Sequence, residues 1–242
     1  MKSSQEQLRS RGYAAPEEIH PYREKSQNEL LELLNDKNAV ARTAAASLLK
    51  IEPETEIQIA AALVRRLSAE KCLYTRLAIC EALEKGGRET ALQMLPFLGK
   101  IGGNQHKSLP DRVSQKKSYP LPRDIIARSL AKMPPGVFPV LLQVLQRDDA
   151  EKICEILDAV GFMAFYHPEL STPEHAEVVF AVMERYPSHE LLLWKAIQCL
   201  CAFPSQKTER LLQKFAAQDT LLGEEVESSL KRIHSRHEET FP

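Results

Sequence analysis

The sequence predicts an all-α fold built from repeated helix pairs, on the basis of composition, spacing and repetition. Leucine and alanine dominate the hydrophobic set, whereas glycine occurs only nine times and aromatic residues make up 6% of the chain, a balance that favours helices over strands. Hydrophobic residues recur at the i, i+3, i+4 spacing of a helix with one buried face, as at Leu30, Leu31 and Leu34. A helical segment also recurs along the chain, which is typical of a repeat architecture.

The repeated segment places a basic residue seven positions before a leucine, with small residues between them. Small residues allow a helix to approach its neighbour closely. The spacing of the copies is irregular, and only the 47 residues between Leu83 and Leu130 demand an insertion. The clear copies are Arg42–Leu49, Arg76–Leu83 and Arg123–Leu130, and weaker copies are 153–160, 193–200 and one ending near Leu230 or Ile233.

A second amphipathic helix precedes each copy, so the chain reads as helical hairpins. Glycine, proline, asparagine and aspartate lie between the periodic segments, where they end helices or form turns. Ser171 to Glu174 is typical of a helix start, with a capping hydroxyl followed by proline and an acidic residue. The expected first helices are 28–34, 54–67, 89–98, 137–145, 172–185 and 206–217.

The first hairpin resembles a HEAT repeat of the bacterial type that also occurs in phycobilisome-lyase-like proteins. Residues 29–36, ELLELLND, and residues 40–49, VARTAAASLL, carry this resemblance. It implies an α-solenoid, an ARM-type superhelix of about five to six hairpins, in which Asp36 in the turn and Arg42 early in the second helix tie the repeat together. The implied organisation is an N-terminal leader or cap over 1–26, a solenoid over 27–235 with a basic insertion at 99–121, and a C-terminal tail over 236–242.

In such a solenoid the second helices line a concave surface, which is the default binding site. Offsets taken from the repeat place Trp194 on that face as an anchor for a partner, and the alternative is that its ring packs in the core between repeats. The acidic and basic residues of the face have their own alternative, as solvated side chains in weak surface ion pairs. The expected face consists of Glu81, Asp124, Arg128, Asp158, Trp194 and Gln198, together with Thr43, Ser47, Leu77 and Cys154.

The insertion is the second candidate site. Between Gly99 and Arg123 there are six basic residues and a single acid, Asp111. A loop of this length is usually functional or disordered. One hypothesis is an arm that contacts an acidic partner or phosphate through Lys107, Lys116, Lys117, His106 and Tyr119. The other hypothesis is a mobile insertion whose charged residues keep it soluble.

Net charge and cysteine content argue against several classes of function. A net charge of −1 gives no overall attraction to nucleic acid or to an anionic membrane. The N-terminal segment has no apolar signal region and no stretch approaches the length of a membrane span, so we expect a cytoplasmic protein. Five cysteines without a CxxC pair indicate reduced core residues and no zinc site.

Motifs of catalysis are absent, with no GxSxG, P-loop, GxGxxG or HExxH. Repeated His-Glu pairs, which hold iron in deoxyhypusine hydroxylase on a HEAT scaffold, are also missing. We therefore expect no cofactor and no bound metal, and a non-catalytic scaffold that binds a protein or peptide on its concave face. The alternative is a nucleic-acid-binding or DNA-repair solenoid of the glycosylase-like type, and an enzyme whose groups converge only in space stays a third option.

Overall fold

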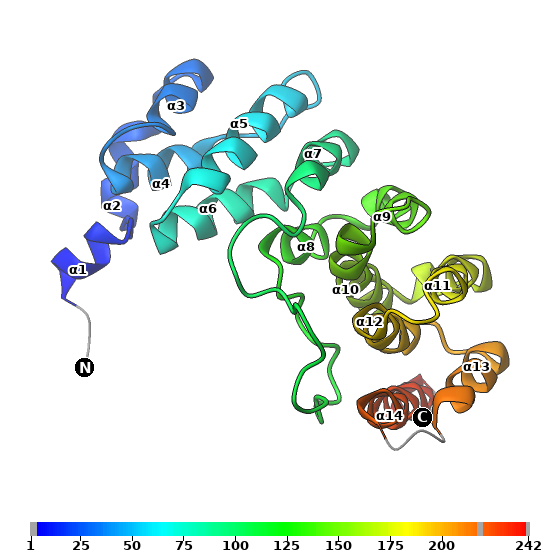
Figure 1. The fold of residues 1–242 in the computed structure, drawn as a ribbon. Coiled ribbons are helices and arrows are strands. Elements are labelled where there is room, and N and C mark those ends of the chain that lie inside the picture. Colours follow the sequence, from blue (N-terminus) through cyan, green and yellow to red (C-terminus); the bar gives the residue numbers. More distant parts are fainter. Residues whose placement is uncertain (1–3, 217–219, 241–242) are drawn as a thin grey trace. The chain divides into compact units, whose positions relative to one another are not determined.

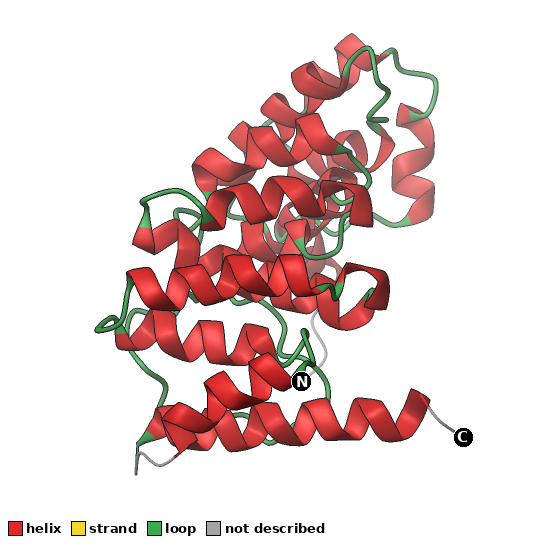
Figure 2. Ribbon diagram, turned by 90° about the vertical axis from the view of Figure 1, so that its right-hand side faces the viewer, coloured by secondary structure: helices red, strands yellow, loops and turns green. Residues whose placement is uncertain are grey.

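The chain is all-helical. The computed structural model describes the backbone of residues 4–216 and 220–240 and the side chains up to Ser235, and within these residues it contains no strand. Figure 2 shows helices joined by loops throughout. No helix in this part of the chain is long and apolar enough to cross a membrane. The protein divides into two compact units, unit 1 over residues 1–97 and unit 2 over residues 98–242, and each is described by itself.

Unit 1 consists of paired helices that share neighbours (Figure 1). Helix α4 contacts α3 and α6, and helix α5 contacts α6 and α7. Its core is formed by small and branched residues, such as Ala44, Ala45, Ile59 and Leu63, all fully buried. The helices are α1 (Gln5–Ser10), α2 (Pro16–Ile19), η1 (His20–Tyr22), α3 (Gln27–Leu33), α4 (Ala39–Leu48), α5 (Glu56–Ala69), α6 (Leu73–Leu83), α7 (Arg88–Met94) and η2 (Leu95–Phe97).

The N-terminal residues pack on unit 1 as a cap. Helices α1, α2 and η1 all contact α4, and the hydroxyl of Thr43 donates a 2.7 Å hydrogen bond to the carbonyl of Gly12. Gly12 has a φ of +84°, and a Cβ there would approach the Thr75 hydroxyl to 2.5 Å. Glycine is needed because its backbone both turns left-handed and passes this close to α6. Of the predicted leader over 1–26, residues 1–3 lie outside the described residues.

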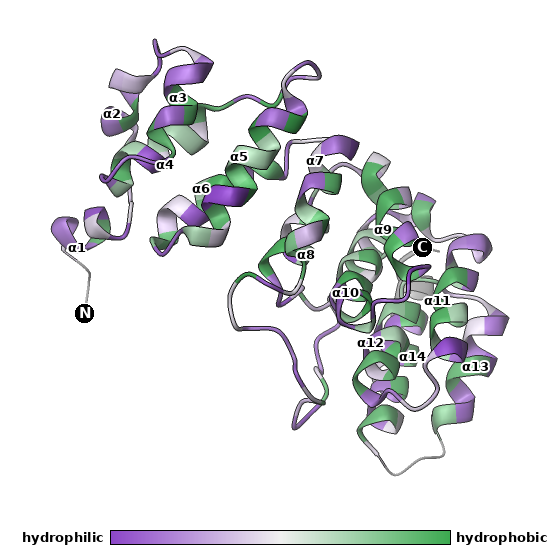
Figure 3. Ribbon diagram, turned by 45° about the horizontal axis from the view of Figure 1, so that its top comes forward, coloured by the Kyte–Doolittle hydropathy of each residue, from purple (hydrophilic) through white to green (hydrophobic). Residues whose placement is uncertain are grey.

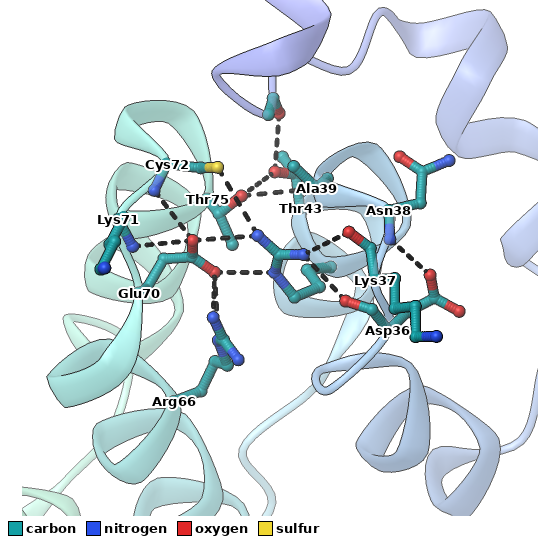
Figure 4. A network of polar contacts seen from close by, with 12 residues as sticks. Asp36, Lys37, Asn38, Ala39, Thr43, Arg66, Glu70, Lys71, Cys72 and Thr75 are labelled. Atoms are coloured by element: carbon teal, nitrogen blue, oxygen red, sulfur yellow. Dashed lines mark hydrogen bonds and ion pairs between the residues drawn. The ribbon is translucent and has the colours of Figure 1, made fainter.

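A guanidinium network joins the hairpins of unit 1 (Figure 4). Arg42 Nη1 donates to the carbonyl oxygens of Asp36 at 2.8 Å and Lys37 at 3.0 Å, while Nε and Nη2 form a bidentate ion pair with Glu70 at 2.8 and 3.0 Å. Arg42 therefore ties its own turn to the next one. Asp36 takes part through its backbone, and its carboxylate accepts from the amide of Asn38 instead. Burial raises the pKa of Glu70, but the hydrogen bonds from Arg42 and the Cys72 amide, together with the charges of Arg42 and Arg66, outweigh it, and the pKa falls to about 2.

Unit 2 contains two sets of helices. Helices α8, α10, α12 and α14 contact one another in sequence, and α9, α11 and α13 each pack against one of them (Figure 1). Hydrophobic residues recur along each of these helices (Figure 3), and the packed faces include Phe138, Ile156, Met163 and Ile197. We call α8, α10, α12 and α14 the inner helices. The bounds are α8 (Ile125–Leu130), η3 (Pro135–Val137), α9 (Phe138–Leu145), α10 (Ala150–Tyr166), η4 (Pro168–Leu170), α11 (Pro173–Arg185), α12 (Glu190–Leu200), α13 (Gln206–Ala216) and α14 (Leu221–Thr240).

Helix boundaries follow the local chemistry that the sequence indicated. The side chain of Thr172 accepts from the amide of His175, and Pro173 occupies the first turn of α11, as predicted. The C-terminal boundary differs from the expected one. Helix α14 continues through residues 236–240, where the tail was placed, and residues 241–242 lie outside the described residues.

Candidate functional site

The basic insertion crosses the inner helices of unit 2. We call residues 99–123 the strap. It contains no helix, and Figure 1 shows it running from beside α8 toward α14. Its apolar residues Ile101, Val113 and Tyr119 are buried, whereas Lys107, Lys116 and Lys117 are exposed. The strap thus packs against unit 2 through its apolar side chains and leaves its lysines exposed.

Helix α14 holds the strap by its backbone. The hydroxyl of Ser228 donates to the carbonyl of Ser114 at 3.0 Å, and Arg232 donates to the same carbonyl at 3.1 Å and to that of Lys116 at 3.3 Å. Arg232 is buried and also pairs with Glu225 at 3.1 Å. These contacts are made to main-chain carbonyls, so they do not depend on the side chains of Ser114 and Lys116.

Trp194 lies in the core and completes this network. Its side chain is 6% exposed, and its Nε1 donates a 2.8 Å hydrogen bond to Glu225, which is itself fully buried. The ring of His106 from the strap packs edge-on against the indole, with centroids 5.0 Å apart. The core alternative for Trp194 is therefore the observed one, and its role is to position the strap and α14.

Tyr119 fastens the strap to α10. Its ring is 2% exposed and packs against Phe162 and Phe165, with centroids 6.2 and 5.6 Å away. A methyl group at Gly161, in the middle of α10, would overlap the Tyr119 hydroxyl and come within 3.0 Å of the Cys199 Cα. A glycine inside a helix lowers stability by about 1 kcal/mol relative to alanine. Here the missing side chain leaves the space that the Tyr119 side chain occupies. Tyr119 was expected to contact a partner, but it is buried inside unit 2.

Asp124 joins the two ends of the strap. The fully buried carboxylate caps α8 by accepting from the amide of Ala127 at 2.8 Å. It also accepts from the Gln105 side-chain amide at 2.7 Å and from the Gly99 amide at 3.2 Å. Every one of these donors is neutral. Asp124 was expected to project from an open face, and the strap covers it.

A buried charge cluster lies beneath the strap. Lys195 Nζ on α12 donates to Glu155 Oε1 and Asp158 Oδ2 on α10, both at 3.1 Å. The three residues are 0%, 4% and 5% exposed. Burial raises the pKa of Glu155 to about 7, although Lys195 opposes the rise, and it raises that of Asp158 as well. The cluster therefore holds a carboxyl group that titrates close to neutral pH.

His106 separates two cavities between the strap and the inner helices. Burial, Arg123 and Lys195 lower the pKa of its imidazole to about 4, so the ring is neutral near pH 7. Arg123 Nη1 lies 3.2 Å from His106 Nε2, which accepts the hydrogen bond in this state. One cavity of about 410 Å³ is lined by Trp194, Asp158 and residues of the strap, and the other of about 350 Å³ is lined by Glu155 and Gln105.

The predicted face residues separate into two groups. Asp124, Asp158, Trp194 and Gln198 of unit 2 come together but are buried, because the strap fills the space in front of them. Arg128 is half-buried and donates to the Pro122 carbonyl at 2.8 Å. In unit 1 Thr43 is buried under the N-terminal cap, while Leu77 and Glu81 are exposed on α6. Cys154 is buried, and Ser47 is exposed on α4.

Sequence reasoning missed the residues that hold the strap and the cluster. Lys195, Glu155, Glu225 and Arg232 are charged residues inside helices, where a solvated position is the usual expectation, and only their partners on other helices make burial possible. Gly161 gave a usable signal, because a glycine inside a strongly helical pattern often marks a close approach. No group of three metal-binding side chains occurs among the described residues.

Comparisons with known proteins give no family. No protein-family model matches the chain. No curated protein matches it either. Among solved structures, a crystal structure of an engineered protein from a structural genomics consortium aligns with 87% of this chain and 99% of its own, at 16% sequence identity and a TM-score of 0.37.

Proposed function

We propose that this chain is an α-solenoid of HEAT-like helix hairpins that acts as a non-catalytic adaptor for a protein or peptide partner. The repeated helix pairs of the sequence and the pairing of helices within each unit support the architecture. Helical hairpins that stack in this way leave an extended surface on one side, which repeat proteins use for binding. The proposal assigns no chemical reaction to the chain.

The observation that carries the proposal is the way α14 holds the strap. Buried Ser228 and Arg232 donate to the carbonyls of Ser114 and Lys116, so helix α14 already holds a stretch of this chain by its backbone. A partner segment would lie beside the strap, next to its exposed cations. The exposed Lys107, Lys116 and Lys117 would favour a partner that carries acidic residues.

Photo-crosslinking tests this surface. A photoreactive phenylalanine at Lys107 or Lys117 should crosslink the same protein in cells of the source organism, and charge reversal at Lys116 should weaken capture at both positions. Lys214, an exposed residue of α13, gives the matched control position. Crosslinking of the same proteins from Lys214, or capture that ignores the Lys116 change, would contradict the proposed surface.

A nucleic-acid-binding solenoid is the second candidate, and the exposed cations of the strap favour it. Arg112, Lys116 and Lys117 lie close together in sequence and are exposed, so they could contact phosphates. Fluorescence anisotropy with duplex DNA separates the two candidates. Strong binding that weakens steeply with salt, and that is lost in Lys116→Glu/Lys117→Glu, would replace the protein-binding proposal with this one.

A further inference from the structure

One cavity beneath the strap has an acidic interior. We call it the Glu155 cavity; it has a volume of about 350 Å³ and lies between the strap, α10 and the start of α12. Gly99, Cys154 and Leu191 contribute apolar lining next to the Glu155 side chain. The exposed residues Lys107 and Glu151 lie where it opens to solvent. Its volume is within the usual range of ligand sites.

Near this cavity, buried carboxylates outnumber the buried cations that could balance their charge. Glu155, Asp158 and Asp124 are carboxylates that are at most 5% exposed, and the buried cation that pairs with them is Lys195. Asp124 is satisfied by neutral N–H donors, and Arg123, whose charge also acts on Asp158, is exposed. A buried charge that lacks a counter-ion is costly, so this arrangement favours a further cation.

Glu155 is the carboxylate with bonding capacity left. Its Oε1 accepts from Lys195, while its Oε2 is buried and has no hydrogen-bond partner. An ionised carboxylate accepts several hydrogen bonds through both oxygens, and one left unmade in the interior needs an explanation. The Glu155 side chain is 4% exposed and lines the cavity, whereas Oε2 itself has less than 1 Å² of exposed surface, so a ligand in the cavity reaches this oxygen when the carboxylate turns toward it.

We propose that the Glu155 cavity binds a guanidinium or primary ammonium group carried on an aliphatic stem, with the Glu155 carboxylate as its counter-ion. The cavity is far larger than a bare ion needs, and the apolar lining from Leu191 and Cys154 suits a stem of methylene groups. Such a group is the side chain of an arginine or lysine in a partner protein, or one end of a free small amine.

Binding of three small probes, followed by amide NMR shifts of the full chain, tests the site. Acetyl-Gly-Arg-Gly-amide represents a protein side chain, agmatine represents a free amine, and acetyl-Gly-citrulline-Gly-amide is the neutral isostere of the first. We expect saturable shifts at Gly99, Gln105 and Glu155 with both cations. Tighter binding of the peptide identifies a protein side chain as the ligand, and tighter binding of agmatine a free amine. Equal binding of the citrulline peptide would overturn the proposal.

Two substitutions distinguish binding at Glu155 from nonspecific attraction of a cation to acidic residues elsewhere on unit 2. Glu155→Gln keeps the shape and removes the charge, and it should weaken agmatine binding by about tenfold or more, as expected for loss of a charge-assisted contact. Glu184→Gln removes an exposed carboxylate of α11 in the same unit and should leave binding unchanged. If both variants bind agmatine as the unsubstituted protein does, Glu155 is not the counter-ion.

A pH series on the unsubstituted chain tests the charge of Glu155 without replacing that residue. Agmatine requires the ionised carboxylate, so with a Glu155 pKa of about 7 its affinity should rise about tenfold between about pH 6 and about pH 8. Other charged or titratable groups could also affect the profile. Those that act on Glu155 from the helices are Lys195, Asp158 and Asp124. Those that line the cavity are Lys107 and His106 of the strap, Glu151 of α10 and His189 at the start of α12. His106 stays neutral over this range, and repeating the series in His189→Gln excludes the other imidazole. A flat profile together with unchanged agmatine binding in Glu155→Gln would overturn the proposal. The crosslinking experiment at the strap tests the proposed function separately from both results.

Discussion

Replacing Lys195 with methionine removes the only ammonium of the buried cluster and keeps most of the aliphatic stem. Glu155 and Asp158 then lie close together in the interior without a cation between them. Each carboxylate must either ionise at high cost or take up a proton. The free energy of unfolding of unit 2 should therefore fall, and the fall should depend on pH.

The size of the effect follows from the two contacts. Lys195 Nζ lies 3.1 Å from an oxygen of each carboxylate. At an effective dielectric constant of about 20, one such contact contributes roughly 5 kcal/mol of Coulomb energy before the cost of burial is subtracted. Removing one partner of a buried ion pair costs about 3 to 5 kcal/mol net. Because whole domains are stable by about 5 to 15 kcal/mol, the loss would be a large fraction of the stability of unit 2.

Urea unfolding followed by tryptophan fluorescence is the assay. Trp194 is the single tryptophan of the chain and is buried in unit 2, so the signal reports on that unit. The folded pKa of Glu155, about 7, already exceeds the value of about 4.3 in an unfolded chain. Stability therefore declines as pH rises between these values, and without Lys195 the decline should steepen. The loss in Lys195→Met should be larger near pH 8 than near pH 5.

A compensating variant provides the control. Lys195→Met combined with Glu155→Gln and Asp158→Asn removes all three charges and should recover most of the lost stability, since an uncharged cluster of similar volume has no unpaired ion. A loss below about 1 kcal/mol in the single variant, as for a surface pair, would refute the reasoning. So would a loss that is the same at both pH values.

Four further substitutions, in both units, have expected outcomes. Glu155→Gln should reduce the decline in unit 2 stability between about pH 4.5 and 7, measured by the same urea unfolding, because one of the two carboxyl groups with a raised pKa is gone while Asp158 remains. Glu70→Gln should speed hydrogen exchange in α4 and α6 near neutral pH, and the difference should shrink as pH falls from about 4.5 toward 2, where the unsubstituted carboxylate loses its charge. Gly161→Ala should displace the strap's tyrosine and destabilise unit 2 by about 1–3 kcal/mol, whereas Gly136→Ala, with open space around it, should not. Arg232→Met should speed trypsin cleavage within the strap, whose lysines are already exposed, and cleavage at the unsubstituted rate would show that α14 does not hold it.

The sequence alone determined that the chain is helical and placed most of the helices after residue 26. Hydrophobic periodicity and capping residues are local properties, so α3, α9 and α11 begin and end close to where the pattern placed them. The same local pattern located the insertion, because the gap between Leu83 and Leu130 exceeds the other spacings. It also separated the exposed lysines of the strap from the apolar helices around it.

Only the tertiary structure showed which residues of the predicted face the strap covers. Repeat offsets placed Asp158 and Trp194 on one face of successive helices, and they do lie together, but the strap packs over them and buries both. Whether a polar residue is solvated or buried depends on a partner far away in sequence, as Lys195 depends on Glu155, 40 residues distant. Periodicity records only the orientation of a residue on its own helix, so the strap's path and the charge cluster beneath it could come only from the folded chain.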